Sequence, residues 1–104
     1  MLSPQPSRSD ILVCYDVNTG TKEGRGRLRR VAKACTNYGQ RVQDSVFECS
    51  VGVVELHKLR TRLLEVIVLS EDSLRIYHFR DQRDKVIESH GIDKYIDFNA
   101  PLIT

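Results

Sequence analysis

The sequence predicts an α+β domain in which two amphipathic helices cover one face of an antiparallel sheet. Short runs rich in β-branched and aromatic residues predict strands, segments with apolar residues at helical spacing predict two helices, and the two kinds of segment alternate along the chain. With 104 residues, of which 40% are hydrophobic and 29% charged, the chain has the size and composition of one globular domain.

The chain begins with a stretch that has no core-forming pattern. Residues 1–10, MLSPQPSRSD, contain two prolines and three serines, and they predict a flexible leader to a single domain over 11–104. The leader lacks the apolar stretch of a signal peptide, and no part of the chain approaches the roughly 20 apolar residues of a membrane span. We therefore expect a cytoplasmic protein that does not associate with membranes.

The first predicted elements are a strand, a loop and a helix. Residues 11–17, ILVCYDV, predict a buried central strand, and residues 18–26, with three glycines, predict a mobile loop. We expect the first helix over 27–38 and Gly39 after it in a left-handed cap conformation. The apolar residues of this helix lie on one face: Leu28, Val31, Ala32, Cys35 and Tyr38.

The middle of the chain predicts β-structure followed by a second helix. Residues 41–51, RVQDSVFECSV, are rich in β-formers and contain no Gly or Pro, so they form either one long bulged strand or a tight pair of strands. The second amphipathic helix ends near Ser70. Its apolar positions are Leu56, Leu59, Leu63 and Ile67.

The last third of the chain completes the predicted sheet. Residues 72–73 predict a turn, and 74–79 alternate as a strand. A charged connection then leads to two short β-like pieces, 95–98 and 102–103, the second of which Pro101 confines to a sheet edge. The order β-α-β-β-α-β is that of a ferredoxin-like sandwich, a topology shared by many functions.

Charge is distributed unevenly along the chain. Residues 1–62 hold 11 Lys and Arg against 6 Asp and Glu, whereas residues 63–104 hold 5 against 8. The basic excess is concentrated on the first predicted helix and the loop before it: Lys22, Arg25, Arg27, Arg29, Arg30 and Lys33. Such a cluster is either a solvated helix face or a surface for phosphates. The glycines around it do not match the P-loop pattern, which argues against nucleotide binding of that kind.

Asp16 is the candidate catalytic residue. It comes at the end of the first predicted strand, where an unpaired buried carboxylate would cost several kcal/mol. Asp16 is therefore either a cap at the strand end or a ligand for Mg²⁺, which is usually held by one or two carboxylates together with substrate phosphates.

Other kinds of site lack a pattern. The three cysteines are far apart in sequence among apolar neighbours and predict buried, reduced thiols. The three histidines have no zinc-binding spacing, and no local motif of a covalent hydrolase is present. The sequence signature of an RNA-recognition motif is also absent, so we expect Tyr15, Tyr77 and Phe79 to be core residues.

Four segments together resemble the family of small CRISPR-associated adaptation proteins, the endoribonuclease-like partner of the CRISPR integrase. They are YDV (15–17), RLRRVAKACTNYG (27–39), RVQDSVFE (41–48) and DSLRIY (72–77), and the resemblance runs from about Ile11 to Thr104. It implies a ferredoxin-like homodimer in which a C-terminal strand, here about 94–104, crosses to the partner's sheet.

The resemblance also implies functional residues. Asp16 matches the aspartate that faces its symmetry mate across the dimer, with Mg²⁺ as the cofactor. Arg27, Arg30 and Arg41 match basic positions that would bind nucleic acid. The other positions that match characteristic sites of the family are Tyr15, Ser45 and Phe47.

Three functions are compatible with these observations. The first is an Mg²⁺-dependent endonuclease of spacer acquisition that cleaves RNA or double-stranded DNA. The second is a non-catalytic dimeric scaffold that binds DNA and bridges CRISPR integrase subunits. Many members of the family carry further acids in the loop after Asp16, whereas this chain has only Glu23 and the neutral Asn18. A third class, a regulatory dimer that binds a small effector, would not require a basic helix.

Overall fold

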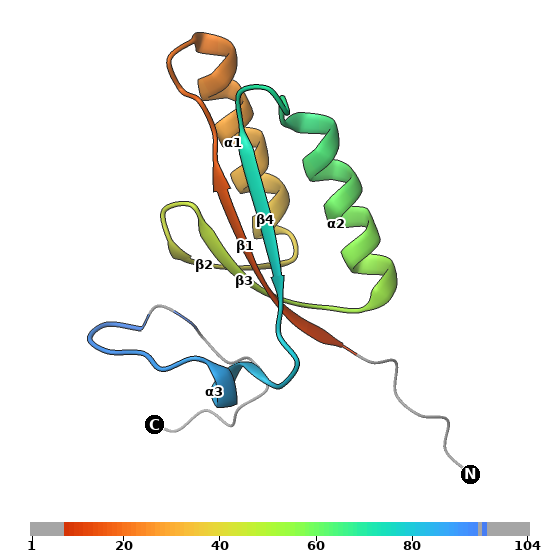
Figure 1. Ribbon diagram of the computed structural model, residues 1–104, viewed down its shortest axis with the longest axis vertical. Helices are drawn as coiled ribbons and strands as arrows, with labels where there is room; N and C mark the ends of the chain where they lie inside the picture. Colours follow the sequence, from red (N-terminus) through yellow and green to blue (C-terminus); the bar gives the residue numbers. More distant parts are fainter. Residues whose placement is uncertain (1–7, 94, 96–104) are drawn as a thin grey trace.

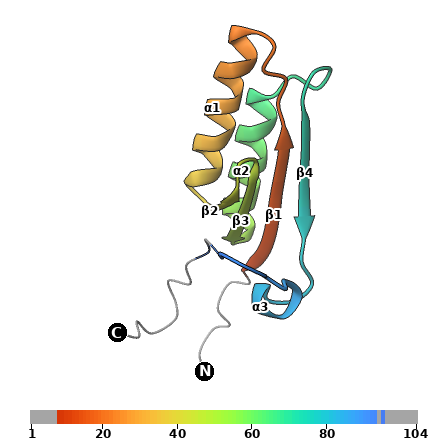
Figure 2. The same cartoon turned by 90° about the vertical axis from the view of Figure 1, so that its left-hand side faces the viewer.

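Four strands and two long helices make up the domain in a computed structural model, which describes residues 8–93 and 95. The elements in chain order are β1 (Ser9–Asp16), α1 (Lys22–Thr36), β2 (Gly39–Gln43), β3 (Val46–Val51), α2 (Val53–Val66), β4 (Ser73–His78) and the short α3 (Arg83–Val86). The strands form one sheet in the order β2-β3-β1-β4. Every neighbouring pair is antiparallel, and α1 and α2 both cover the same face (Figures 1 and 2). The predicted fold class is thus confirmed for the sheet and its helices.

The core lies between this sheet and the two helices. Along β1, Ile11, Val13 and Tyr15 are buried while the residues between them are more exposed. Val13 pairs with Phe47 on β3 and with Ile76 on β4, so the same face of all three strands packs against the helices. Alternate β1 residues therefore lie on the opposite, helix-free face.

The prediction that Tyr15, Tyr77 and Phe79 are all core residues is correct only for Tyr15. Tyr77 is 44% exposed and Phe79 is only partly buried, so the prediction is wrong for these two. The alternation of β4 places Tyr77 on the same side as Arg75, away from the helices.

The first strand begins two residues earlier than predicted. It starts at Ser9, so Ser9 and Asp10, which the sequence assigned to the leader, pair with β3. The backbone N–H of Phe79 also donates to the carbonyl of Asp10 (3.0 Å). Backbone pairing at the end of a strand does not require apolar side chains, which is why composition placed the boundary too late.

The first helix begins five residues before the predicted start at residue 27. Thr21 caps it, because the Thr21 hydroxyl accepts the N–H of Gly24 (3.0 Å). Gly24 is buried in the helix where a Cβ would overlap the Asn18 carbonyl, so this glycine permits a close approach and does not mark a mobile loop.

The predicted left-handed cap at Gly39 is wrong. The helix ends at Thr36, and the single described glycine with a positive φ angle is Gly91. Gly39 instead begins β2 against β3, where a Cβ would overlap the Cys49 sulfur and the Glu48 carbonyl. A requirement for space, rather than for a turn conformation, accounts for glycine at this position.

Residues 41–51 form a tight pair of strands, which decides between the two alternatives. β2 and β3 are joined by a turn at Asp44 and Ser45, and the register shifts between Arg41 and Gln43 as in a β-bulge. The second helix then runs from Val53 to Val66 and ends before the predicted boundary near Ser70.

The chain after β4 folds back towards the beginning of β1. Arg83 at the start of α3 donates its backbone N–H to the Asp10 carboxylate (3.0 Å) and forms an ion pair with Glu48. Its guanidinium carbon lies 3.7 Å from the ring centroid of Tyr95. The predicted exchanged strand, about 94–104, lies outside the described residues except for Tyr95. Among the described residues, no helix is both long and apolar enough to cross a membrane.

Candidate active site and nucleic-acid interface

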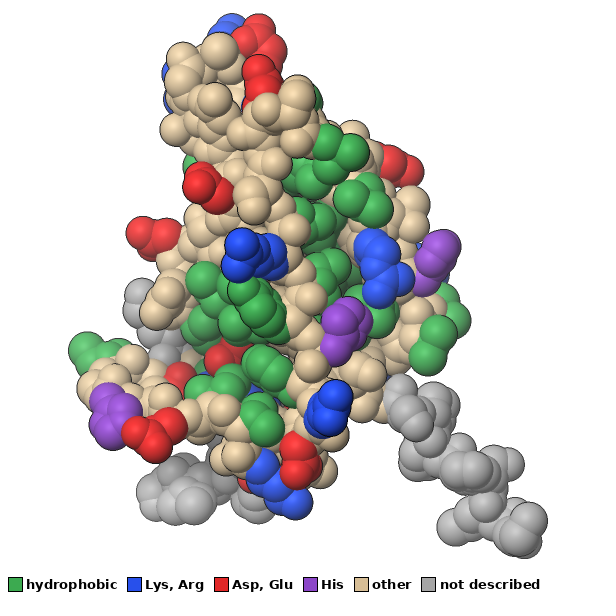
Figure 3. Space-filling model, viewed as in Figure 1, with side chains coloured by type: hydrophobic (Ala, Val, Ile, Leu, Met, Phe, Trp, Pro, Cys, Tyr) green, Lys and Arg blue, Asp and Glu red, His purple; other side chains and the backbone are tan. Residues whose placement is uncertain are grey.

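Asp16 is exposed at the tip of β1, on the helix-free face of the sheet. Its predecessor Tyr15 is buried towards the helices, so the alternation of the strand turns Asp16 to the opposite side. Figure 3 views this face, on which hydrophobic side chains gather over β1 and β4 and Lys and Arg are scattered. Asp16 is therefore accessible to a solvent-borne ligand or to a second protein surface.

Arg75 is the basic residue of β4 that shares this face with Asp16. Asp16 pairs with Ser73 on β4, and Arg75 is the next residue of β4 on the same side. Diagonal neighbours of this kind are separated by about 7–8 Å, which is within reach of a long side chain. The Arg75 guanidinium also donates to the Tyr77 hydroxyl (Nη1 to Oη, 3.2 Å). Sequence reasoning missed Arg75, although the alternation of LRIY places it on the opposite face from Leu74 and Ile76.

A single chain offers only part of a metal site. In the part of the chain that the structure describes, no group of three or more His, Cys, Asp or Glu side chains could hold a metal ion. Asp16 alone supplies one hard oxygen donor, which fits the needs of Mg²⁺ only when a second carboxylate or a substrate phosphate is added. The donor set is thus compatible with an ion shared between two copies of Asp16.

Tyr15, Ser45 and Phe47 come together on the helix-facing side of the strand end. The Tyr15 N–H donates to the Ser45 carbonyl (3.1 Å), and the Tyr15 hydroxyl to the Asp44 carbonyl (3.4 Å). The rings of Tyr15 and Phe47 are stacked with centroids 6.3 Å apart. Burial raises the pKa of Tyr15, so its phenol stays neutral and donates. These contacts fix the backbone that carries Asp16.

Arg41 completes this cluster at its outer edge. The residue is exposed on β2, and its guanidinium carbon lies 5.2 Å from the ring centroid of Phe47. Since Asp16 is on the other face of the sheet, Arg41 and Asp16 lie on different surfaces of one chain. A phosphate at Asp16 is therefore better placed for Arg75 than for Arg41.

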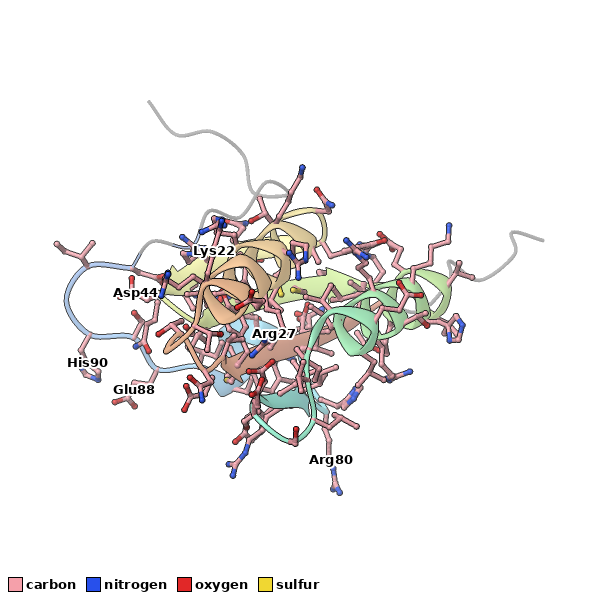
Figure 4. The ribbon with its side chains drawn as sticks, turned by 90° about the horizontal axis from the view of Figure 1, so that it is seen from above. Lys22, Arg27, Asp44, Arg80, Glu88 and His90 are labelled. Carbon is pink, nitrogen blue, oxygen red and sulfur yellow. The ribbon has the colours of Figure 1, made fainter. Side chains whose placement is uncertain are left out.

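Arg27, a predicted nucleic-acid ligand, is turned into the protein. Its side chain is 8% exposed and contacts Asp72, which is 0% exposed, through Nε to Oδ2 (2.8 Å) and Nη2 to Oδ1 (3.1 Å). Its Nη2 also donates to Glu71 (3.0 Å). In Figure 4 the labelled Arg27 lies in the interior, whereas Arg80 points away from the body. This placement argues against a direct phosphate contact for Arg27.

Asp72 also binds backbone groups on both sides of Arg27. Besides Arg27, its carboxylate accepts the backbone N–H of Asn18 (3.0 Å) and of Val68 (2.8 Å). The hydrogen bond from Arg27 is the main cause that lowers the pKa of Asp72 to about 2, and the two backbone donors add to it. The pair thus holds the loop after Asp16, the start of α1 and the turn before β4 together.

Arg30 remains available for an anion. It is exposed on α1, like the other cluster members apart from Arg27, which are Lys22, Arg25, Arg29 and Lys33. The sequence-predicted residues therefore separate into three places: Asp16 on the helix-free face, the Tyr15 cluster behind it, and the basic residues on the helix side.

The cysteines are free thiols, as expected, but Cys14 is only partly buried, so the prediction of three buried thiols is wrong for that residue. Cys35 and Cys49 are buried, and burial raises the pKa of each to about 12. Such thiols are protonated at neutral pH and do not bind metals readily.

These features define a small ferredoxin-like domain with an accessible carboxylate at the end of its first strand and a basic first helix, a class suited to polyanionic partners. The family described as CRISPR associated protein Cas2 matches residues 10–87, and the chain belongs to this family. The resemblance seen in the sequence is thus confirmed.

Similar proteins agree with this assignment. The chain is 50% identical over 93 residues to the CRISPR-associated endoribonuclease Cas2 1 of Moorella thermoacetica, covering 89% of this chain and 97% of the relative. It is 47% identical over 93 residues to the CRISPR-associated endonuclease Cas2 of Halalkalibacterium halodurans, with the same coverage of 89% and 97%. The crystal structure of Streptococcus pyogenes Cas2 at pH 6.5 superposes with a TM-score of 0.70 at 49% identity, covering 79% of this chain and 99% of that one.

Proposed function

We propose that the protein is an Mg²⁺-dependent endonuclease of CRISPR adaptation that cleaves RNA or double-stranded DNA in the cytoplasm. The observation that carries the proposal is the exposed Asp16 at the tip of β1, on a sheet face that no helix of the described residues covers. The relatives from Moorella thermoacetica and Halalkalibacterium halodurans are named as an endoribonuclease and an endonuclease.

A second copy of the chain would complete the site. The helix-free face carries partly exposed Leu12, Cys14 and Val46 beside Tyr77, which is 44% exposed. Packing two such faces around a twofold axis would bury these side chains and present one Asp16 from each copy. The C-terminal residues, about 94–104, would add a strand to the partner's sheet.

The residues of the chain then have distinct tasks. The two Asp16 carboxylates would hold Mg²⁺, whose chemistry when bound is to polarise a phosphodiester and to make a water molecule acidic enough to attack phosphorus. Arg75 would bind a non-bridging phosphate oxygen beside Asp16. The Tyr15–Phe47 packing and the Arg27–Asp72 pair would hold the strand end and the following loop in place, because metal-assisted hydrolysis tolerates little misplacement.

A second candidate is a non-catalytic dimeric scaffold that binds DNA and bridges subunits of the CRISPR integrase. The specific observation in its favour is that five exposed cations follow α1 on the helix side, away from Asp16: Lys22, Arg25, Arg29, Arg30 and Lys33. Under this alternative, Asp16 would have only a local structural role.

Cleavage of labelled RNA and duplex DNA distinguishes the two candidates. Wild type, Asp16→Asn and the control Asp84→Asn would be assayed with Mg²⁺ and with EDTA. Asp84 is an exposed carboxylate on α3, at the opposite end of β1 from Asp16, so its replacement makes the same charge change elsewhere.

The endonuclease predicts that cleavage is lost with EDTA and in Asp16→Asn, while Asp84→Asn cleaves like wild type. Cleavage that persists in Asp16→Asn would overturn the assignment of Asp16. Intact nucleic-acid binding without any cleavage by the wild type would favour the scaffold.

A further inference from the structure

A basic groove runs between α1 and α2 on the helix side of the domain. Its volume is about 430 Å³, within the roughly 300–1,000 Å³ of small-ligand pockets. The lining residues are Arg30, Lys33, Ala34, Asn37, Tyr38 and Arg62. Three of them are cations and none is an acid, so every charged residue of the lining is positive.

A second hollow continues the groove towards the beginning of α1. It measures about 530 Å³, and its charged lining residues besides the paired Arg27 are the cations Lys22, Arg29 and Arg30 and one acid, Glu23. Because Arg30 lines both hollows, the two form one track along α1. A track with cations at both ends suits a polyanion better than a compact anion, which would fill one hollow only.

The cations of the groove are poorly compensated within the chain. Arg62 is 54% exposed, and its closest carboxylate is Glu65 on the same helix at 3.7 Å, a weak surface contact. Arg30 and Lys33, one turn apart on α1, are both exposed. Bringing three like charges around one concave surface costs repulsion that a bound phosphate chain would relieve.

Tyr38 adds an aromatic surface to this wall. It is half-buried just after α1, packs partly against the core and lines the groove beside Asn37. Proteins that bind single strands combine a positive groove with aromatic rings on which unpaired bases stack. A duplex keeps its bases stacked inside and could offer this pocket only its phosphates.

We propose that the groove between α1 and α2 binds single-stranded nucleic acid, with phosphates along Arg30, Lys33 and Arg62 and an unpaired base on Tyr38. This inference deepens the proposed function. It rests on that function because both require a nucleic-acid ligand, but it does not require cleavage at Asp16. The groove lies across the sheet from Asp16, so it binds without cleaving and would hold a single-stranded end or flank while the other face acts on the substrate.

Fluorescence anisotropy with a labelled oligothymidylate in EDTA tests the groove without cleavage. The test variant is Arg30→Gln/Lys33→Gln/Arg62→Gln, and the matched control is Lys58→Gln/Arg80→Gln/Lys85→Gln, which removes three exposed cations elsewhere. Titrations over a range of salt give the slope of log affinity against log salt. Losing three phosphate contacts should reduce that slope by about 2 units for a single strand.

Tyr38 is tested by two replacements, since its ring also packs against the core. Tyr38→Phe should bind like wild type, whereas Tyr38→Leu should bind about 5- to 100-fold more weakly with an unchanged salt slope. The proposal is overturned if the groove variant keeps the wild-type slope, or if the control variant loses as much. Equal weakening of duplex binding by Tyr38→Leu, or displacement of the oligonucleotide by thymidine monophosphate at similar concentration, would also overturn it.

The same variants separate this inference from the proposed function. Asp16→Asn should retain oligothymidylate binding, because Asp16 lies on the opposite face of the sheet from the groove. Loss of cleavage in Asp16→Asn with no groove binding in the wild type rejects the groove alone. Groove binding without any Mg²⁺-dependent cleavage rejects the nuclease alone.

Discussion

Replacing Arg27 should lower the free energy of unfolding of the domain, and should not weaken a direct contact with nucleic acid. In the variant Arg27→Met the apolar length of the side chain is kept, but the Asp72 carboxylate, 0% exposed, loses both hydrogen bonds from the guanidinium. It keeps the backbone N–H groups of Asn18 and Val68. The variant therefore measures what the guanidinium contributes to stability, because the other hydrogen bonds of Asp72 are kept.

The magnitude follows from removing one partner of a buried ion pair. This costs about 3–5 kcal/mol because an uncompensated charge is left behind. We expect the lower end, about 3 kcal/mol, since the two remaining amide donors keep part of the solvation of Asp72. That is a large share of the roughly 5–15 kcal/mol by which domains are stable.

Urea unfolding at pH 7 followed by circular dichroism measures this loss, with Arg29→Met as the control. Arg29 is exposed on the same helix, so its replacement should change the free energy of unfolding by less than about 0.5 kcal/mol. In the double variant Arg27→Met/Asp72→Asn the two effects should not add, because the charge that needs compensation is gone. If Arg27→Met unfolds like wild type and only nucleic-acid affinity falls, the structural assignment of Arg27 is refuted.

Three further predictions concern the same framework. The folded-state pKa of Asp72, about 2, is below its ordinary value of about 3.9, so the ionised carboxylate stabilises the fold above pH 4. This contribution to the free energy of unfolding should be lost as the pH falls towards 2. Acid titration of unfolding should show the loss in wild type but not in Asp72→Asn. Gly39→Ala should destabilise the domain by about 1–3 kcal/mol, because the added Cβ would overlap β3. Gly26→Ala lies within α1, where the added Cβ would meet only the flexible ends of arginine side chains, so it should be neutral or stabilising by up to about 1 kcal/mol. A melting temperature of Gly39→Ala equal to or above that of Gly26→Ala would contradict this. A thiol reagent at pH 8 should reach Cys35 and Cys49 only after unfolding, since burial raises the pKa of both to about 12; rapid labelling of either thiol in the native protein would show that the core is open.

The sequence could predict the elements of the fold because their periodicities are strong. The apolar run of β1 and the helical spacing on α1 and α2 are local patterns, and a sheet flanked by two helices follows from their order. The positions of Gly24 and Gly39 could not be interpreted correctly from local pattern. Each glycine is required because another segment packs closely against it in the folded chain, Asn18 against Gly24 and β3 against Gly39.

The candidate site was only partly predictable for a similar reason. Asp16 is identifiable because a carboxylate ends an apolar strand, and the alternation of that strand places it on the helix-free face. Arg27 and Arg30 look equivalent in the sequence, yet only the folded chain brings Asp72, 45 residues away, against Arg27. Arg75 and Arg62 escaped notice because their relevance depends on strand register and on the packing of two helices.

Mixed dimers test the central claim that two copies of Asp16 form one active site. Wild type and Asp16→Asn would be co-refolded in equal amounts, and Mg²⁺-dependent cleavage would be measured at constant total protein. Random pairing leaves about one quarter of the dimers with two aspartates, so activity should fall to about one quarter of the wild-type value. Activity of about one half would mean that each subunit acts alone, and it would contradict the shared site.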